Sequence, residues 1–188
     1  MNTTSPVREQ ILAHAVTLIM LRGYHGFSYR DLSELVGVKT SSIHYYFPSK
    51  DDLVLEAVNV YSSAALGAVH SIDSSLSAKE KLAAYTVGFA TVLGEGDRIC
   101  LCGMLAADMG SLPPNIVQAV QAFFRGNESW LAKVLAQGTK DGTLVVNGTS
   151  EQVAQTVFAA YQGSVLSSRL FQTKTRLEEV PAAWVVST

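Results

Sequence analysis

Polar and aromatic side chains crowd into one short segment, residues 39–46, which reads KTSSIHYY. Hydroxyl, imidazole and phenol groups can hydrogen-bond to base edges and phosphate oxygens, and a threonine methyl can contact a thymine methyl. In a helix, Ile43 and Phe47 lie one turn apart and would point toward the protein interior. The opposite, outer face would then carry Thr40, Ser41, His44 and Tyr45. This pattern favours a helix that contacts the major groove of DNA, and the alternative is a polar helix that only faces solvent.

Lys50 follows this segment at the expected start of the next helix. The first N–H groups of a helix have no partner within the helix, and the helix dipole adds partial positive charge there. An ammonium at this point favours the binding of a phosphate. The charge distribution also favours an anionic partner for this part of the chain. Residues 1–50 carry more basic than acidic side chains, although the formal net charge of the whole chain is −2.

Other kinds of chemistry find little support. The sequence contains no HExxH, no GxSxG and no phosphate-binding loop, so we expect no catalytic residues. Cys100 and Cys102 would face different sides of a helix and do not have the spacing of zinc ligands. We therefore expect a protein that is not an enzyme and holds no metal or cofactor. A helical carrier of small molecules that has lost DNA binding is an alternative, against which the intact outer face and Lys50 argue.

A helix-turn-helix arrangement would position the polar segment. Helical spacing of apolar residues predicts a first helix whose buried side carries Ile11, Ala15, Leu18 and Ile19. After a loop at residues 23–26, Ser28 and Asp31 have the pattern of a capping box that opens a second helix. Gly37 ends that helix. Its buried stripe is expected to be Leu32, Leu35 and Val36.

A short third helix and a fourth helix follow. Lys39 is a poor helix N-cap, so we expect the first turn of the third helix to start at Thr40. Pro48 cannot continue this helix. Ser49 and Asp52 form a second capping-box pattern, which opens the fourth helix.

The remaining residues also have helical patterns, which predicts an all-α fold of about nine helices. Further capping-box patterns occur at Ser77 with Glu80 and at Thr149 with Gln152. Pro181 falls where the ninth helix should continue, so that helix is either kinked there or restarts with Pro181 in its first turn.

The composition and the apolar runs of the sequence indicate the cellular compartment of the protein. An apolar fraction of 48% and a charged fraction of 16% are those of a globular protein with a sizeable core. No apolar run reaches the length of a membrane span, and the N-terminus has no apolar region typical of a secretory signal. Two cysteines do not make a disulfide framework. These features favour a cytoplasmic protein without a membrane partner.

Residues 7–55 resemble the N-terminal domain of the TetR family of bacterial transcriptional repressors. The positions that carry the resemblance are Gly23-Tyr24, Ser28, Arg30-Asp31-Leu32, Gly37-Val38, Tyr45-Tyr46-Phe47 and Ser49-Lys50. The resemblance implies a three-helix helix-turn-helix domain over residues 1–48 and an effector-binding and dimerisation domain over 49–188. It also implies a homodimer that binds a pseudo-palindromic double-stranded operator and is released by a small-molecule effector.

The resemblance assigns the recognition helix to residues 39–47. The residues that it places on DNA are Ser28, Arg30, Lys39, Thr40, Ser41, Ser42, His44, Tyr45 and Lys50. The family commonly has Ser where Lys39 stands, Gly where Ser41 stands, and Tyr-His where His44-Tyr45 stand. The outer face therefore implies an operator specificity of its own.

Aromatic residues of the C-terminal part are candidates for the wall of an effector pocket, with plain core packing as the alternative. Together with one acid in a short apolar stretch, the candidates are Tyr85, Phe89, Met104, Asp108, Phe123, Phe124, Trp130 and Tyr161. Asp108 would orient a polar group of the ligand, or would simply cap a helix or face solvent.

Two further features of this part have alternative interpretations. The segment CLCGMLAAD is similar to the sensor segment of electrophile- and oxidant-sensing repressors of the family, in which Cys100 would be a reactive thiol near Arg98. The alternative is a pair of small buried hydrophobic residues. A stripe of small residues at helical spacing would let two helix backbones approach closely: Thr156, Ala160, Gly163 and Ser167. The resemblance implies that this helix pairs with its two-fold mate in the dimer, and the alternative is close packing within one chain.

Overall fold

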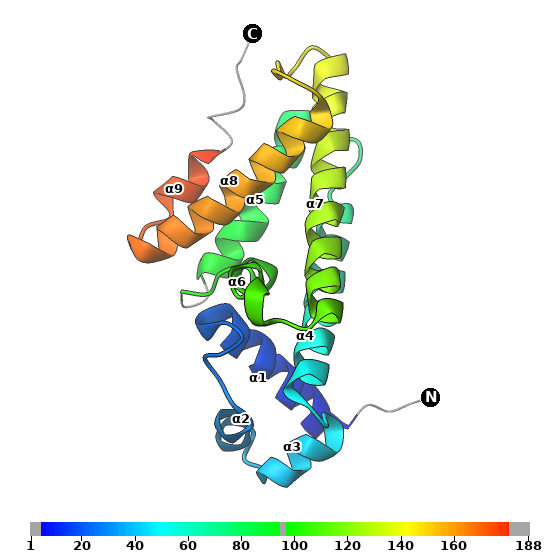
Figure 1. The fold of residues 1–188 in the computed structure, drawn as a ribbon. Coiled ribbons are helices and arrows are strands. Elements are labelled where there is room, and N and C mark those ends of the chain that lie inside the picture. Colours follow the sequence, from blue (N-terminus) through cyan, green and yellow to red (C-terminus); the bar gives the residue numbers. More distant parts are fainter. Residues whose placement is uncertain (1–4, 95–96, 181–188) are drawn as a thin grey trace. The chain divides into compact units, whose positions relative to one another are not determined.

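The computed structural model describes residues 5–94 and 97–180 (Figure 1). Within these residues the chain forms nine α-helices and a short 3-10 helix, with no strand. The predicted all-α class is therefore confirmed. Pro181, where the sequence left a kink or a restart open, lies outside the described residues.

The helices form two compact units. The first unit holds residues 5–64 together with Leu101–Ala122, and the second holds Ala65–Cys100 and the chain from Phe123 onward. The first unit therefore extends beyond the boundary expected at residues 48 and 49, because it also includes the first turns of the fourth helix and the short helix after Cys100.

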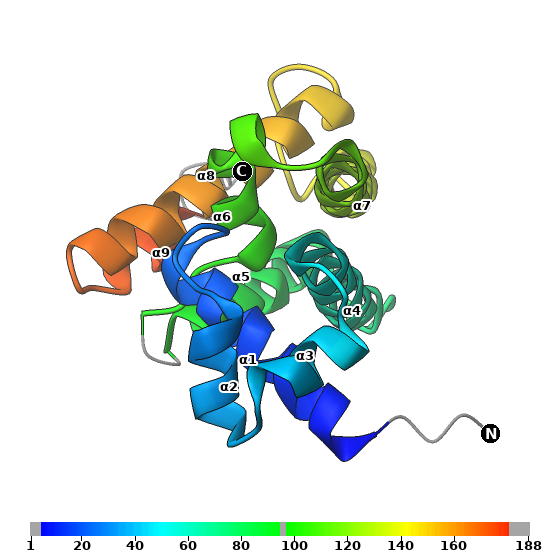
Figure 2. The ribbon, with the colours of Figure 1, turned by 60° about the horizontal axis from the view of Figure 1, so that its bottom comes forward.

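Seven helical segments build the first unit. They are α1 (Pro6–Arg22), α2 (Tyr29–Val36), α3 (Thr40–Tyr46), the first part of α4 (Lys50–His70), α6 (Leu101–Ala107), η1 (Met109–Ser111) and the first turns of α7 (Pro114–Lys140). Helix α1 packs against α2, α3 and α6, and α2 packs against α3 (Figure 1 and Figure 2). The core of the first unit contains the buried side chains of Ile11, Ile19, Leu32, Ile43 and, from α4, Leu53.

Local sequence signals explain where these helices begin and end. Helix α2 begins with the predicted capping box, and α3 begins at Thr40, as expected from the poor capping ability of Lys39. The Ser49 hydroxyl and backbone N–H both donate to the Asp52 carboxylate at the start of α4, which confirms the second box. Helix α2 ends at Gly37, whose φ of 74° is a left-handed conformation that glycine adopts without strain.

The expected burial of Leu35 is wrong, because 52% of this residue is exposed. Tyr29, Leu32 and Val36 share the side of α2 that faces its neighbours, whereas Leu35 lies at the edge of that side. Among the described residues, the main packing partners of this eight-residue helix are α1 and α3, and they leave this edge open.

The second unit is built around α5 (Ala78–Gly94), the later part of α7, α8 (Ser150–Leu170) and α9 (Thr175–Glu178). Helix α8 packs against α5 and α9, and α5 also packs against α9. Capping boxes open α5 at Ser77 and α8 at Thr149, as predicted. The core includes Leu82, Leu131, Val157, Phe158 and Val165.

Helix α4 is long and apolar enough to cross a membrane by length and composition, contrary to the sequence expectation. Its first turns supply Leu53, Val54, Ala57 and Val58 to the core of the first unit. Its later turns carry no charged side chain between Ala57 and Val69, and the alanine, valine and leucine residues there raise the mean hydropathy. Core packing therefore accounts for the apolar residues of the first turns, but only 22% of the apolar window of α4 is buried.

Candidate nucleic-acid interface

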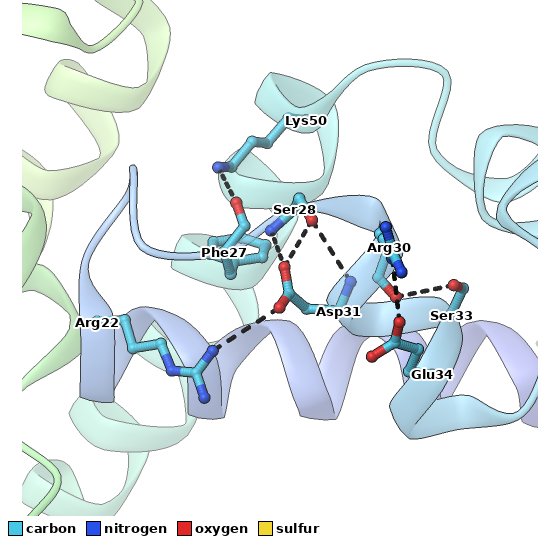
Figure 3. Close-up of polar contacts among 8 residues, drawn as sticks. All are labelled: Arg22, Phe27, Ser28, Arg30, Asp31, Ser33, Glu34 and Lys50. Carbon is cyan, nitrogen blue, oxygen red and sulfur yellow. Dashed lines mark hydrogen bonds and ion pairs between the residues drawn. The ribbon is translucent and has the colours of Figure 1, made fainter.

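The start of α2 places Ser28 and Arg30 on the surface of the first unit (Figure 3). The backbone N–H and the hydroxyl of Ser28 both donate to Oδ2 of Asp31, at 2.8 and 2.5 Å. These hydrogen bonds, with a contribution from Arg22, lower the pKa of the Asp31 carboxyl. Arg30 forms an ion pair with Glu34 at 3.1 Å, but both side chains are largely exposed. Such a pair is worth little in water, so Arg30 remains available to a phosphate.

Helix α3 has the two faces expected from its sequence. Ile43 and Phe47 are buried, and the outer-face residues Thr40, Ser41, His44 and Tyr45 are exposed. Lys39 is exposed as well, whereas Ser42 is half-buried. The predicted orientation is therefore confirmed, with Tyr45 the most prominent side chain at 81% exposure.

Lys50 begins α4 as predicted, but its ammonium turns toward the protein. The Nζ atom donates a hydrogen bond to the backbone carbonyl of Phe27 at 2.5 Å (Figure 3). It also lies over the rings of Phe27 and Tyr24, at 4.2 and 4.9 Å from their centroids. Desolvation by burial lowers the pKa of Lys50, against the attraction of Asp31 and Asp51. Lys50 thus anchors the loop between α1 and α2, a role that the sequence did not reveal.

Two tyrosines that sequence reasoning left without a role lie directly behind the outer face. Tyr29 packs its ring against His44, and Tyr46 packs its ring against Tyr45. The only sequence signal for Tyr29 is its place three residues before buried Leu32, which puts both on one side of α2.

Two family models match the chain. One describes bacterial regulatory proteins of the tetR family and matches residues 11–57, which include the outer face of α3. The other describes a tetracyclin repressor-like C-terminal domain and matches residues 78–184, more than half of the chain. The chain belongs to the TetR family.

Solved structures of TetR-family proteins resemble it over nearly the whole length. A transcriptional regulator from Agrobacterium tumefaciens is 32% identical with a TM-score of 0.88, covering 96% of this chain and 98% of that one. A TetR regulator from Legionella pneumophila is 33% identical with a TM-score of 0.86, covering 97% of each chain. These matches identify a helix-turn-helix, DNA-binding transcriptional regulator.

A curated relative adds a more distant comparison. The transcriptional repressor NemR of Escherichia coli is 23% identical over 185 residues, which cover 96% of this chain and 93% of NemR. The structure of its reduced form has a TM-score of 0.84 at 21% identity, covering 98% of this chain and 99% of that one, and shows a shared fold.

Six of the eight candidate effector residues of this TetR-family chain lie together in the second unit. Tyr85 packs against Phe89, Trp130 and Tyr161, with ring centroids 5.2 to 5.4 Å apart. Phe123 and Phe124 join the same cluster through Phe158, which the sequence did not single out. That this cluster binds a ligand stays a prediction, and plain core packing is the alternative.

Polar groups inside the aromatic cluster are paired. The Tyr85 hydroxyl donates to Oδ1 of Asn127 at 2.8 Å, and the hydroxyls of Tyr161 and Thr86 lie 2.6 Å apart. Burial raises the pKa of both tyrosines, so both phenols stay protonated. Asn127 and Thr86 are polar residues of the cluster that sequence reasoning missed.

The other two candidates, Met104 and Asp108, lie in the first unit. Asp108 accepts a hydrogen bond from the backbone N–H of Tyr24 at 2.7 Å. The Met104 side chain lies near Gly23, where an added Cβ atom would be 3.4 Å from its terminal carbon. Asp108 precedes η1 but makes no side-chain capping hydrogen bond there, so this contact is a tertiary one with the loop after α1 and not a helix cap.

Both cysteines are buried. Cys100 is 3% exposed and Cys102 is fully buried, with its Sγ atom 3.8 Å from the hydroxyl of Ser62. A sensor thiol has to be partly exposed, because its oxidant or electrophile must reach it. The burial of Cys100 does not meet this requirement.

The stripe of small residues on α8 lies at least partly at the surface. Thr156 and Gly163 are exposed, and Ala160 and Ser167 are half-buried. A Cβ atom added at Gly163 would meet no described atom within 4 Å, apart from its own helix backbone and chain neighbours. Close packing within the chain therefore does not explain Gly163. Large apolar residues that the sequence did not single out continue this exposed face: Leu166, Leu170 and Phe171.

Proposed function

We propose that this TetR-family chain is a repressor that binds a pseudo-palindromic operator as a homodimer and leaves it when a small effector binds. The observation that carries the proposal is the outer face of α3, where hydroxyls, an imidazole and a phenol are exposed opposite the buried Ile43 and Phe47. Such groups match the donors, acceptors and thymine methyls of the major groove. Phosphate contacts would come from Ser28, Arg30, Lys39 and Lys50 around this face.

The homodimer would form through α8. Its exposed face combines the small residues Thr156 and Gly163 with large apolar side chains, among them Leu170 at 76% exposure. Exposed apolar surface of this kind is typical of an interface. A two-fold dimer presents two recognition helices, which read two inverted half-sites about 34–36 Å apart.

The effector would bind at the aromatic cluster of the second unit. Tyr85, Phe89, Trp130 and Tyr161 offer ring faces and buried hydroxyls, which suit a largely apolar ligand with a few polar groups. Release from DNA requires that the effector bind unequally to two arrangements of the dimer. We expect the protein to act in the bacterial cytoplasm, where operator DNA is available.

Selection from a randomised library of DNA duplexes tests the proposal. The full-length protein should enrich an inverted repeat, and its affinity for that repeat should fall steeply as salt increases. Size-exclusion chromatography with light scattering on the same sample should give the mass of a dimer. A protein that enriches no sequence would contradict the proposal, whatever its oligomeric state.

A second candidate is a repressor that senses electrophiles or oxidants through Cys100. The similarity to NemR, whose solved structure is described as the reduced form, favours it. The burial of Cys100 argues for a reversible ligand instead. Alkylation of the native protein, followed by DNA binding, separates the two candidates.

A further inference from the structure

We propose that Tyr29 and Tyr46 are positioning residues that set the orientation of His44 and Tyr45, the two rings on the outer face of α3, and so contribute to sequence selectivity. The inference rests on the proposed function, because it assumes that α3 reads DNA. Tyr29 is buried and Tyr46 is half-buried, so each would act through its neighbour.

Tyr29 connects the start of α2 to the end of α3. Its hydroxyl donates to the backbone carbonyl of Phe47 at 2.8 Å. Phe47 is the C-cap of α3, where carbonyl groups lack partners within the helix. The Tyr29 ring lies 4.7 Å from the His44 ring, centroid to centroid, at an angle of 59°. Tyr29 therefore holds the end of the recognition helix through its hydroxyl and contacts the His44 ring with its own ring.

Burial, together with the nearby charges of Asp52 and Asp51, raises the pKa of Tyr29 to about 12. The hydroxyl consequently remains protonated at neutral pH and can donate to Phe47 throughout the working range. Loss of this single donor leaves a largely buried carbonyl without its partner, which is costlier than the loss of an exposed hydrogen bond.

The orientation of His44 has a consequence for base recognition. Its Nδ1 atom lies 3.4 Å from the backbone carbonyl of Pro48, and a carbonyl can only accept, so this contact favours the tautomer with the hydrogen on Nδ1. In the neutral ring, Nε2 is then an acceptor. Its partner in the major groove would be the exocyclic amino group of adenine or cytosine. At 3.4 Å the contact with Pro48 is weak, so the ring depends on Tyr29 for its placement.

Tyr46 provides the matching support for Tyr45. The hydroxyls of Tyr46 and Ser5 lie 2.9 Å apart, and the Tyr46 ring meets the Tyr45 ring edge-on at 5.1 Å. Ser5 occupies the N-cap position of α1, but its side chain makes no capping hydrogen bond. Its hydroxyl therefore serves Tyr46 instead, and links α1 to the recognition helix.

Both pairs share one physical effect. An exposed ring loses rotational freedom when it binds, and that loss opposes binding. A ring already held against an anchored neighbour loses less, and it meets one base geometry better than others. Removal of an anchor should therefore weaken the discrimination between DNA sequences more than the attraction to DNA in general.

Conservative variants test this effect. Tyr29→Phe and Tyr46→Phe keep the ring and remove only the anchoring hydroxyl. The probes are the duplex that the wild-type protein enriches from a randomised library, single-base variants of that duplex, and an unrelated duplex. The preference for the enriched duplex over its variants should fall by about threefold to tenfold, the net worth of one hydrogen bond. Affinity for the unrelated duplex, and its salt dependence, should stay unchanged.

Two controls separate positioning from general destabilisation. Tyr24→Phe removes another hydroxyl of the first unit, one that bonds Asp51, and should leave the base preference intact. Ser5→Ala removes the partner of Tyr46 without removing a helix cap, so Ser5→Ala combined with Tyr46→Phe should lose no more selectivity than either change alone.

The outcomes are distinguishable. Unchanged base preference in both phenylalanine variants would overturn the inference, and so would an equal loss of affinity for enriched and unrelated duplexes. A wild-type protein that selects no sequence would overturn the proposed function, and the inference with it. Thermal unfolding of each variant verifies that the protein measured is folded.

Discussion

Asp108 accepts a hydrogen bond from the backbone N–H of Tyr24, with 2.7 Å between the two atoms. The contact joins the end of α6 to the loop that follows α1. Gly23 leaves space for it, because a Cβ atom at this position would lie only 2.7 Å from the same carboxylate oxygen. The acid that the sequence suggested for a ligand thus holds the loop that leads into α2.

Replacement of Asp108 should therefore destabilise the protein. We expect Asp108→Ala to lower the free energy of unfolding by about 1.5–3 kcal/mol, the range for hydrogen bonds to charged groups. Asp108→Asn keeps an acceptor and should cost less. Urea denaturation followed by circular dichroism measures the change, with Asp141→Ala in an exposed turn as the control. Equal stability of the Asp108 and Asp141 variants would show that the contact contributes nothing.

Lys50 presents a choice between two roles, because its ammonium already binds the Phe27 carbonyl. If it also reaches a phosphate, Lys50→Ala should weaken DNA binding and make the slope of log K against log salt shallower by about one unit. Tyr45→Ala should weaken binding without a change in slope, since it removes no charge. Titrations with the selected duplex at several salt concentrations measure both variants.

The exposed lysine Lys133 of the second unit provides the control for Lys50. Lys133→Ala should leave the salt slope unchanged. A Lys50→Ala variant that binds more weakly with an unaltered slope would instead assign Lys50 to the anchoring of the loop alone.

Local sequence patterns predicted much of this structure, because their causes are local. The Ser28–Asp31 and Ser49–Asp52 boxes act within one turn of chain, and Ile43 and Phe47 share a face by helix geometry alone. These signals were enough to locate the helix-turn-helix and its outer face.

Contacts between distant residues were not predictable in this way. Asp108 meets a backbone N–H in a loop 84 residues earlier, and no pattern in side-chain types reports such a partner. The inward turn of Lys50 depends on where the Phe27 carbonyl lies, and the exposure of Leu35 depends on which neighbours α2 lacks. Each of these outcomes is decided by packing rather than by local propensity.

The two cysteines should react slowly in the folded protein. Because both are buried, an alkylating reagent can reach them only when the structure opens. Brief alkylation followed by mass spectrometry should find little label on either thiol, and full label on both after denaturation. Rapid labelling of Cys100 alone, accompanied by loss of DNA binding, would instead support the electrophile-sensing candidate.

Stability should decrease in alkaline solution through Tyr29. The phenol has a pKa of about 12 in the folded protein against a reference value of 10.0. Between these values the unfolded chain has released the proton and the folded chain retains it, so the free energy of unfolding falls as pH rises. Tyr29→Phe should show a shallower fall than the wild type over this window, as measured by urea denaturation at each pH. Parallel curves would indicate that Tyr29 ionises alike in both states.

Gly163 offers a clean test of the proposed dimer interface on α8. In the described structure an added Cβ atom at this position meets open space, so Gly163→Leu should leave the fold of one chain intact. If a second copy packs closely there, the larger side chain should separate the two helices and prevent dimerisation. Light scattering then measures a monomer, while circular dichroism and the melting temperature stay close to those of the wild type.

The same variant also reports on DNA binding, because a monomer can contact only one half-site. Its affinity for an inverted repeat should fall to that for an isolated half-site. Gly88→Leu is the matched control, since Gly88 on α5 also has open space around an added Cβ atom but lies on a different helix. A stable dimer in Gly163→Leu, with the wild-type preference for an inverted repeat, would place the interface on another surface of the chain.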